Sequence, residues 1–281
     1  MSKPRILLQF DTDQHASSFD AVVAADAGVE MLLQYAQVTT DNVESLVHGA
    51  MFTRGPEDLK NTAIFIGGGD VAAGEAVYAR VLKCFFGPMR VSVMLDSNGS
   101  NTTAAAAVLR AAKHLDLSST TALVLAGTGP VGLRVARLLL RAGATVRLSS
   151  RQIDRAQQAC DSIGQQLDHG GRLSPCEGHD AIEGCDAVFA CGAAGVQLLD
   201  ARTLDDANVQ LAIDLNAVPP VGIEGIDVMD RAKEVGNRIQ YGAIGVGGTK
   251  MKIHRAAIKR LFKSNDHALD AEAIYEIGES M

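Results

Sequence analysis

The sequence lacks tryptophan, and aromatic residues make up only 4% of its 281 residues. Its five cysteines include no C-x-x-C pair, and no two of its seven histidines are four residues apart. These absences argue against a disulfide framework and a zinc site, and they predict a protein of a reducing compartment without a metal centre. No apolar run approaches the ~18 residues that a membrane span requires. The N-terminal segment turns acidic after one short apolar run, so we expect no signal peptide and a cytoplasmic protein with no membrane partner.

Basic residues are also in the minority, because 26 Lys and Arg face 33 Asp and Glu and give a net charge of -7. Nucleic-acid-binding proteins usually carry a basic face, so we expect no nucleic-acid partner. Hydrophobic residues reach 47%, an ordinary globular balance that excludes wholesale disorder. A core of Ala, Val, Leu and Ile with few aromatics is typical of buried parallel sheets.

Short apolar runs alternate with helical patterns along the chain, which predicts α/β architecture with mostly parallel sheets covered by helices. Strands are expected at 5–10, 62–66, 90–95, 122–126, 145–148, 187–190 and 209–214. Helices are expected from Ser17-Ser18 to Gly28 and at 42–49, 71–86, 100–115, 131–141 and 153–167, with two more in the tail from Lys250 onward. We predict two α/β domains with a cleft between them, residues 1–105 and 106–249, followed by C-terminal helices at 250–281 near the cleft.

The strongest motif is a glycine-rich run, Gly127-Thr128-Gly129-Pro130-Val131-Gly132. It follows the apolar run ALVLA and opens the helical pattern VGLRVARLLLRAG, which is the context of a dinucleotide-binding turn. Gly127 is expected to permit the tight turn, Gly129 to let the backbone approach a pyrophosphate, and Gly132 to let the helix pack closely. The pyrophosphate would then meet the N–H groups at the start of the helix. The alternative is an ordinary glycine-rich turn, and the context favours a Rossmann-type dinucleotide-binding domain.

The end of the next predicted strand indicates which dinucleotide binds. NAD-specific sites usually carry an acid there, whereas this chain has Ser149, Ser150 and Arg151, with no acid until Asp154. Hydroxyls and a guanidinium suit a 2′-phosphate, and Arg155 lies one helical turn further on. We therefore predict NADP as the cofactor, with NAD possible. The alternative for Arg151 is a solvated surface side chain.

Seven segments carry a resemblance that covers essentially the whole chain. They are QFDTD at 9–13, FIGGGDVAAGE at 65–75, FFGP at 85–88, MLDSNGSNTTAAA at 94–106, VLAGTGPVG at 124–132, DLNAVPPVGIEGID at 214–227 and GAIGVGGTKMKIHRA at 242–256. With these residues the sequence resembles the NAD(P)-dependent methylene-tetrahydromethanopterin dehydrogenases of bacterial one-carbon metabolism, and more distantly the methylene-tetrahydrofolate dehydrogenases. The resemblance implies a pterin-substrate domain before an NADP-binding domain, in a homo-oligomer. It implies NADP-dependent oxidation of methylene- to methenyl-tetrahydromethanopterin in formaldehyde metabolism, with tetrahydrofolate as the alternative carrier.

The resemblance also implies two catalytic residues, Lys250 in the substrate cleft and Asp20 near the pterin. Each has a plainer interpretation, which stays open at this point. Lys250 also fits a solvated lysine at the start of a helix, and Asp20, three residues after Ser17, fits a helix cap. Phe19 fits either stacking on the pterin or a place in the core.

Polar contacts to the pterin are expected from Asp96, Asn98 and Thr102, and Asn216 is expected to contact the cofactor. His254 is expected to be structural rather than catalytic. Loss of a hydride from a carbon between two nitrogens leaves a cation that both nitrogens stabilise, so no strong general base is required. The protein's part is then positioning and electrostatics. A lysine cation beside that carbon is unfavourable, so Lys250 is expected to bond a pterin carbonyl or to be partly neutral through desolvation.

A non-catalytic NADP-binding sensor is the competing class of function. Such a protein need not keep a pterin site, whereas this chain has the polar loop 96–103 and the GGTK segment before residue 251. These two segments favour an enzyme.

Overall fold

The computed structural model describes residues 3–281, which divide into two compact units. The first unit extends to residue 102 and includes residues 251–281, and the second unit comprises residues 103–250. Both boundaries fall inside helices, namely α4 (Ser100–Ala111) and α8 (Ala243–Leu261). The C-terminal segment therefore groups with the N-terminal part of the chain.

The first unit contains a five-stranded parallel sheet in the order β12-β4-β3-β1-β2. Its strands are β1 (Ile6–Asp11), β2 (Met31–Tyr35), β3 (Thr62–Gly67), β4 (Ser92–Leu95) and β12 (Ala268–Leu269). Its helices are α1 (Ser18–Asp26), α2 (Val43–Met51), α3 (Val71–Cys84) and α9 (Ala271–Glu279), with 3-10 turns at Leu59–Asn61 and Ser97–Gly99. β3 lies between β1 and β4 and is buried along its whole length.

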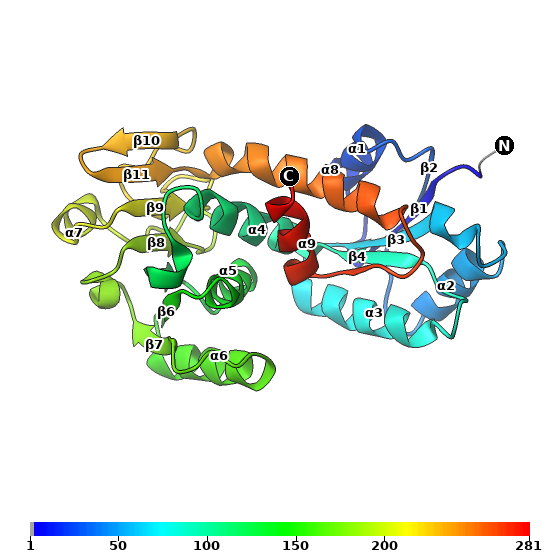
Figure 1. The fold of residues 1–281 in the computed structure, drawn as a ribbon, viewed down its shortest axis with the longest axis horizontal. Helices are drawn as coiled ribbons and strands as arrows, with labels where there is room; N and C mark the ends of the chain where they lie inside the picture. Colours follow the sequence, from blue (N-terminus) through cyan, green and yellow to red (C-terminus); the bar gives the residue numbers. More distant parts are fainter. Residues whose placement is uncertain (1–2) are drawn as a thin grey trace. The chain divides into compact units, whose positions relative to one another are not determined.

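Side-chain caps start three helices of this unit, α1, α3 and α9. Ser17 Oγ accepts the N–H of Asp20 at 3.2 Å, and the Asp70 carboxylate accepts the N–H of Ala73 at 3.1 Å. The helices α2 and α3 contact each other, and both contact β3 (Figure 1). Their shared core is aliphatic, as the composition predicts, and includes Val43, Val47, Ile64, Ile66, Val77 and Val81.

The second unit contains a seven-stranded sheet in the order β10-β11-β9-β8-β5-β6-β7. Its strands are β5 (Thr121–Leu125), β6 (Thr145–Ser150), β7 (Leu173–Glu177), β8 (Ala187–Ala190), β9 (Leu211–Asp214), β10 (Arg231–Val235) and β11 (Arg238–Tyr241). Its helices are α5 (Pro130–Arg141), α6 (Ile153–Gln166) and α7 (Ala201–Asp206), with 3-10 turns at Leu117–Ser119 and Asp180–Ile182. All pairings are parallel except the β10–β11 hairpin, which forms one edge (Figure 1). α5 packs on β5 and β6, and α6 packs on β6 and β7.

The predicted α/β architecture with parallel sheets is confirmed. The sequence analysis missed five strands. Four have weak patterns: β2 is mostly exposed, β7 contains a proline, β10 is exposed throughout, and β12 has two residues. The fifth, β11, is mostly buried but has only four residues, two of them Arg238 and Gln240. The two predicted tail helices are confirmed as α8 and α9, but the predicted start near Lys250 was wrong, because α8 begins at Ala243. The glycines in the first turns of α8 weaken the helical pattern of the sequence, so these turns were not predicted. Gly245 is nevertheless required there, since a Cβ would lie 1.8 Å from the Asp230 carbonyl oxygen.

In the part of the chain from residue 3 onward, no helix combines the length and the hydropathy needed to cross a membrane.

Candidate functional site

The turn between β5 and α5 has the geometry of a phosphate-binding turn, with one difference from the prediction. The left-handed backbone lies at Ala126, whose φ is +51°, and not at Gly127. Gly127 is required for a different reason, because a Cβ there would lie 2.7 Å from Leu148 Cγ on β6. The N–H of Gly127 donates to the Ser149 carbonyl at 2.7 Å, so this turn is tied to the end of β6.

The other two glycines of the motif face different surroundings. A Cβ on Gly132 would lie 2.7 Å from Gly127 Cα and 2.9 Å from the Ala126 carbonyl oxygen, so α5 packs against the turn only with glycine there. A Cβ on Gly129 would meet only ordinary contacts, 3.5 Å from the Ala126 oxygen and 3.9 Å from the Cys191 oxygen. The protein itself therefore does not require glycine at 129, and the space above it is open to a ligand.

The start of α5 is suited to an anion. Gly129 is the N-cap and has no side-chain cap, and Pro130 follows as the first helical residue. Thr128 and Val131 are half-buried, and Pro130 is exposed. The turn follows the carboxyl end of β5, where ligands bind in parallel α/β sheets. The N–H groups at this uncapped helix start are left without a side-chain partner, an arrangement that favours an anion.

The residues expected at the 2′-phosphate fall into two kinds. Arg151 and Arg155 are exposed. Ser149 is buried and its hydroxyl donates to the Gly178 carbonyl, so it holds the connection after β7. Ser150 is buried at the end of β6, and its hydroxyl accepts the Gln152 N–H at 3.4 Å. The two guanidinium groups are therefore better placed for an anion than the Ser149 hydroxyl.

Asn216 lies in the loop after β9 and is 4% exposed. Its Nδ2 donates to the Pro220 carbonyl at 3.1 Å, and its Oδ1 accepts the Val218 N–H at 2.9 Å. The Asp214 carboxylate accepts the N–H groups of Asn216 at 2.9 Å and Ile223 at 2.8 Å. Burial raises the pKa of Asp214. Asn216 thus shapes its own loop, a role that the sequence did not indicate.

Three loops at the carboxyl edge of the first unit's sheet are bonded to one another. They follow β1, β3 and β4. The Asn98 N–H donates to the Gly68 carbonyl at 2.7 Å, and the Ser97 hydroxyl donates to the Gly67 carbonyl at 3.2 Å. The Gly69 N–H donates to Asp13 Oδ2 at 2.8 Å. The strings QFDTD, FIGGGD and MLDSNGS, distant in sequence, therefore form one connected edge.

Two of the expected pterin contacts are buried in this edge. Asp96 Oδ1 accepts the N–H groups of Asn101 at 2.9 Å and Thr102 at 3.0 Å, and Asp96 Oδ2 accepts the Thr102 hydroxyl at 2.6 Å. Asp96 is 2% exposed and Thr102 is fully buried. These two side chains fix the start of α4. Asn98 differs, because it is exposed and its backbone is left-handed, with φ +53°.

Asp20 belongs to the first turn of α1, which Ser17 caps, and it also lies at this edge. Its N–H bonds Ser17 Oγ, as the capping interpretation predicts, while its Oδ2 lies 3.5 Å from the position that a Cβ on Gly67 would take. Burial raises the pKa of Asp20, and the nearby acids Asp96 and Asp11 add to that rise. The charge of His254 and a hydrogen bond from Ser17 oppose it. Phe19 is 52% exposed, so it is not a core residue.

Lys250 lies inside α8 and is half-buried, so the interpretation as a solvated lysine at a helix start was wrong. It precedes His254 by four residues, which puts both side chains on one face of α8.

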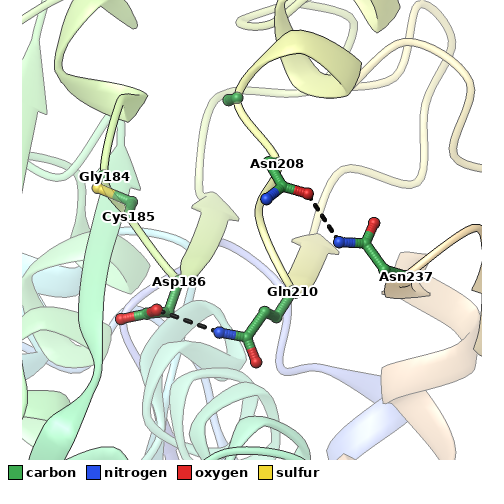
Figure 2. Close-up of a pocket in the computed structure, with 7 residues that line it drawn as sticks. Gly184, Cys185, Asp186, Asn208, Gln210 and Asn237 are labelled. Carbon is green, nitrogen blue, oxygen red and sulfur yellow. Dashed lines mark hydrogen bonds between the residues drawn. The ribbon is translucent and has the colours of Figure 1, made fainter.

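A polar hollow in the second unit is lined by none of these residues. It is lined by Gly184, Cys185, Asp186, Ala207, Asn208, Gln210 and Asn237, which precede β8, β9 and β11 (Figure 2). The Asn237 amide donates to Asn208 Oδ1 at 2.7 Å, and the Gln210 amide donates to Asp186 Oδ1 at 3.2 Å. The hollow thus lies at the amino ends of the strands, the edge opposite the Gly129 turn, and its polar side chains bond one another.

Comparison with known proteins agrees with both halves of this description. Residues 18–98 match the family described as "Methylene-tetrahydromethanopterin dehydrogenase, N-terminal", and residues 126–275 match the family described as "NAD(P)H-binding". The fold is similar to that of quinate dehydrogenase from Corynebacterium glutamicum in complex with NAD, with a TM-score of 0.55 and 13% identity over 99% of this chain and 100% of that chain. That likeness concerns the fold alone.

Two relatives come from Methylorubrum extorquens. The chain is 46% identical over 288 residues to the "Bifunctional protein MdtA", with 100% of both chains covered. It is 32% identical over 280 residues, 94% of each chain, to the "NAD(P)-dependent methylenetetrahydromethanopterin dehydrogenase". The chain belongs to the family of NAD(P)-dependent methylene-tetrahydromethanopterin dehydrogenases.

Proposed function

We propose that this protein oxidises the methylene group of methylene-tetrahydromethanopterin to the methenyl cation and transfers the hydride to NADP. The observation that carries the proposal is the combination of two features in one chain of this family. One is a glycine turn that is open at Gly129, and the other is the first unit, of which residues 18–98 match the family's N-terminal domain. NADP, when bound, supplies the hydride acceptor at its nicotinamide ring.

The second unit's residues bind the dinucleotide in this proposal. The uncapped start of α5 receives the pyrophosphate over Gly129. Arg151 and Arg155 are both exposed beyond β6 and provide charge for the 2′-phosphate. An acid in their place would repel that phosphate, so the acid-free segment after β6 supports NADP over NAD.

The first unit's residues act on the pterin. Asp20 has a carboxylate at the edge of the sheet, where a negative charge stabilises the positive charge that develops as the hydride leaves. Asn98 is exposed at the same edge and contributes polar contact, while Asp96 and Thr102 hold its loop from behind. Phe19 is exposed beside Asp20 and provides an aromatic face for the pterin ring.

Lys250 has the role of orienting the substrate. Its ammonium group would disfavour a carbocation next to it, so we assign it to a pterin carbonyl. Because the methylene carbon loses no proton in this step, the mechanism assigns no general base.

A steady-state assay with two carriers and two dinucleotides tests the proposal. Methylene-tetrahydromethanopterin and methylene-tetrahydrofolate are each supplied with NADP or NAD, and the reduced dinucleotide is followed by its absorbance. We expect the highest kcat/KM for tetrahydromethanopterin with NADP. The 46% identical relative is named a bifunctional protein, which agrees with activity on tetrahydrofolate as a second outcome. Absence of turnover with all four pairs, while NADP still binds, would favour a sensor and refute the proposal.

We further propose that the protein works in the cytoplasm as a homo-oligomer, without nucleic-acid or membrane partners. The net charge of -7 and the free cysteines support this setting. Size-exclusion chromatography with light scattering measures the oligomer directly, and a monomer at micromolar concentration would refute that part.

A further inference from the structure

A buried histidine lies beside the carboxylates of the first unit's edge. His254 on α8 is 1% exposed. Its ring stacks on Phe65 of β3, with centroids 5.5 Å apart and planes at 23°, and lies 6.5 Å from the ring of Phe19. Stacking alone would be satisfied by any aromatic ring at this position. The charged groups around it indicate why the ring is an imidazole.

Two of the three nearby carboxylates are used by the backbone. Asp11 Oδ1 accepts the Asp13 N–H at 3.0 Å, and Asp11 Oδ2 accepts the Ser17 N–H at 2.9 Å. Asp96 accepts two backbone N–H groups and the Thr102 hydroxyl. Both carboxylates therefore accept hydrogen bonds from the chain and hold loops together. Asp20 is the third, and the Ser17 hydroxyl oxygen accepts its backbone N–H at 3.2 Å.

Asp11 and Asp20 are close enough to repel each other. The Oδ2 atoms of both lie 3.5 Å from the point that a Cβ on Gly67 would occupy, so they are separated by at most twice that distance. Like charges at such a separation oppose each other strongly in a partly buried site. A carboxylate at Asp20 therefore needs a cation on its other side.

His254 is the group that can supply that charge within the first unit. Burial raises the pKa of Asp20, and the negative charges of Asp96 and Asp11 raise it further. Among the influences that lower this pKa, the charge of His254 is the largest, ahead of the Ser17 hydroxyl. Imidazole is suited to this role, because small changes in its surroundings make it a cation near neutral pH. Lys250 is one helical turn before His254 on α8 and is the next cation on that face.

We propose that His254 is a positioning residue of the dehydrogenase, which keeps the Asp20 carboxylate ionised and directed to the edge above Gly67 where the pterin binds. The inference deepens the proposed function and rests on it for the identity of the substrate. His254 acts through Asp20 and does not itself touch the reacting carbon. Its loss would therefore weaken the enzyme most at low pH, where Asp20 is first neutralised.

Two variants test this inference. His254→Phe keeps an aromatic ring against Phe65 without the charge, and His254→Gln serves if the larger ring disturbs packing. We expect the acid limb of the kcat/KM profile for the methylene substrate to move to higher pH. The loss of activity should be roughly tenfold greater at about pH 6 than at about pH 8. Titration of NADP should give unchanged affinity, since its site belongs to the second unit.

The titration of Asp20 gives a readout that does not depend on turnover. Carbon-13 NMR of the side-chain carboxyls, with the Asp20 signal assigned by its absence in Asp20→Asn, should show Asp20 titrating at higher pH in both His254 variants. His114→Phe is the matched control, because His114 also packs on an aromatic ring, that of Tyr241, but belongs to the second unit. It should leave the Asp20 titration unchanged. In an Asp20→Asn background, His254→Phe should add no further pH dependence.

The possible results distinguish a failure of the role of His254 from a failure of the proposed dehydrogenase function. An equal loss of activity at every pH, with the Asp20 titration unmoved, would overturn the role of His254. Absence of wild-type turnover would refute the proposed function instead, and the NMR titration would still decide whether His254 sets the charge of Asp20.

Discussion

Alanine substitutions at Gly129 and Gly132 should separate ligand binding from folding within a single turn. Gly129 has an extended backbone, φ -77° and ψ 166°, that any residue adopts, and a Cβ there would meet protein atoms no closer than 3.5 Å. At Gly132 the same atom would lie 2.7 Å from Gly127 Cα, a backbone atom that cannot move aside on its own. The first substitution should therefore affect the ligand, and the second the fold.

The expected magnitudes follow from these contacts. Alanine is a poorer N-cap than glycine by about 0.5–1 kcal/mol, but Gly→Ala removes about 0.4–1 kcal/mol of unfolded-state entropy, so Gly129→Ala should be near neutral for stability. Gly132→Ala should destabilise by about 1–3 kcal/mol through overpacking. Filling the space above Gly129 should weaken NADP binding at least tenfold, ~1.4 kcal/mol, and Gly129→Val should abolish it.

Thermal unfolding and titration calorimetry measure the two effects independently. Gly129→Ala should melt close to the wild type and bind NADP weakly, and Gly132→Ala should melt several degrees lower. Normal NADP affinity in a folded Gly129→Val protein would show that this turn does not hold the cofactor and would refute the reasoning.

Four further substitutions test single residues. Arg151→Ala should raise the KM for NADP but not for NAD, because the loss of a charge-assisted contact to the 2′-phosphate costs about 1.5–3 kcal/mol. An unchanged KM for NADP would show that the 2′-phosphate binds elsewhere. Lys250→Ala should lower turnover at least tenfold, ~1.4 kcal/mol, and leave the affinity for NADP unchanged. Lys250→Arg should restore turnover only in part. Normal turnover and a normal KM for the pterin in Lys250→Ala would show that Lys250 is not part of the site. Thr102→Val should lower the free energy of unfolding in urea by about 1.5–3 kcal/mol, because the buried Asp96 carboxylate loses a 2.6 Å hydrogen bond; equal stability would contradict that role. The pKa of Asp20 is raised in the folded protein, so its ionisation reduces stability as pH rises from its ordinary pKa to the raised one. Asp20→Asn should therefore melt no lower than the wild type at about pH 7 while losing turnover, and a lower melting temperature would favour a purely capping role.

The sequence predicted those features that depend on local pattern. Buried strands such as β3 and β5 are continuous apolar runs, and the glycine turn has a required order of strand, glycines and helix. The helix start at Ser17 was readable because capping is a local interaction. Exposed edge strands such as β10 could not be predicted, since their pairing depends on neighbours and not on their own residues.

The details of the site depend on contacts between distant segments. Thr102 and Asn98 are four residues apart in one polar loop, yet one is fully buried against Asp96 and the other is exposed. The sequence alone offers no signal that separates them. His254 and Asp20 are still further apart in sequence, and only folding brings α1 and α8 together within the first unit. A lone histidine in an apolar helix pattern is more often structural, which is why the sequence analysis assigned His254 no part in the site.

Transfer of an isotopically labelled hydride tests the central claim most directly. Methylene-tetrahydromethanopterin with deuterium on both methylene positions is incubated with the protein and NADP, and the reduced dinucleotide is examined by mass spectrometry and proton NMR. The proposed reaction predicts one deuterium at nicotinamide C4, a slower rate than with the unlabelled substrate if hydride transfer limits turnover, and no labelled product with Gly129→Val. Reduced dinucleotide without deuterium, or none at all from a protein that binds NADP, would contradict it.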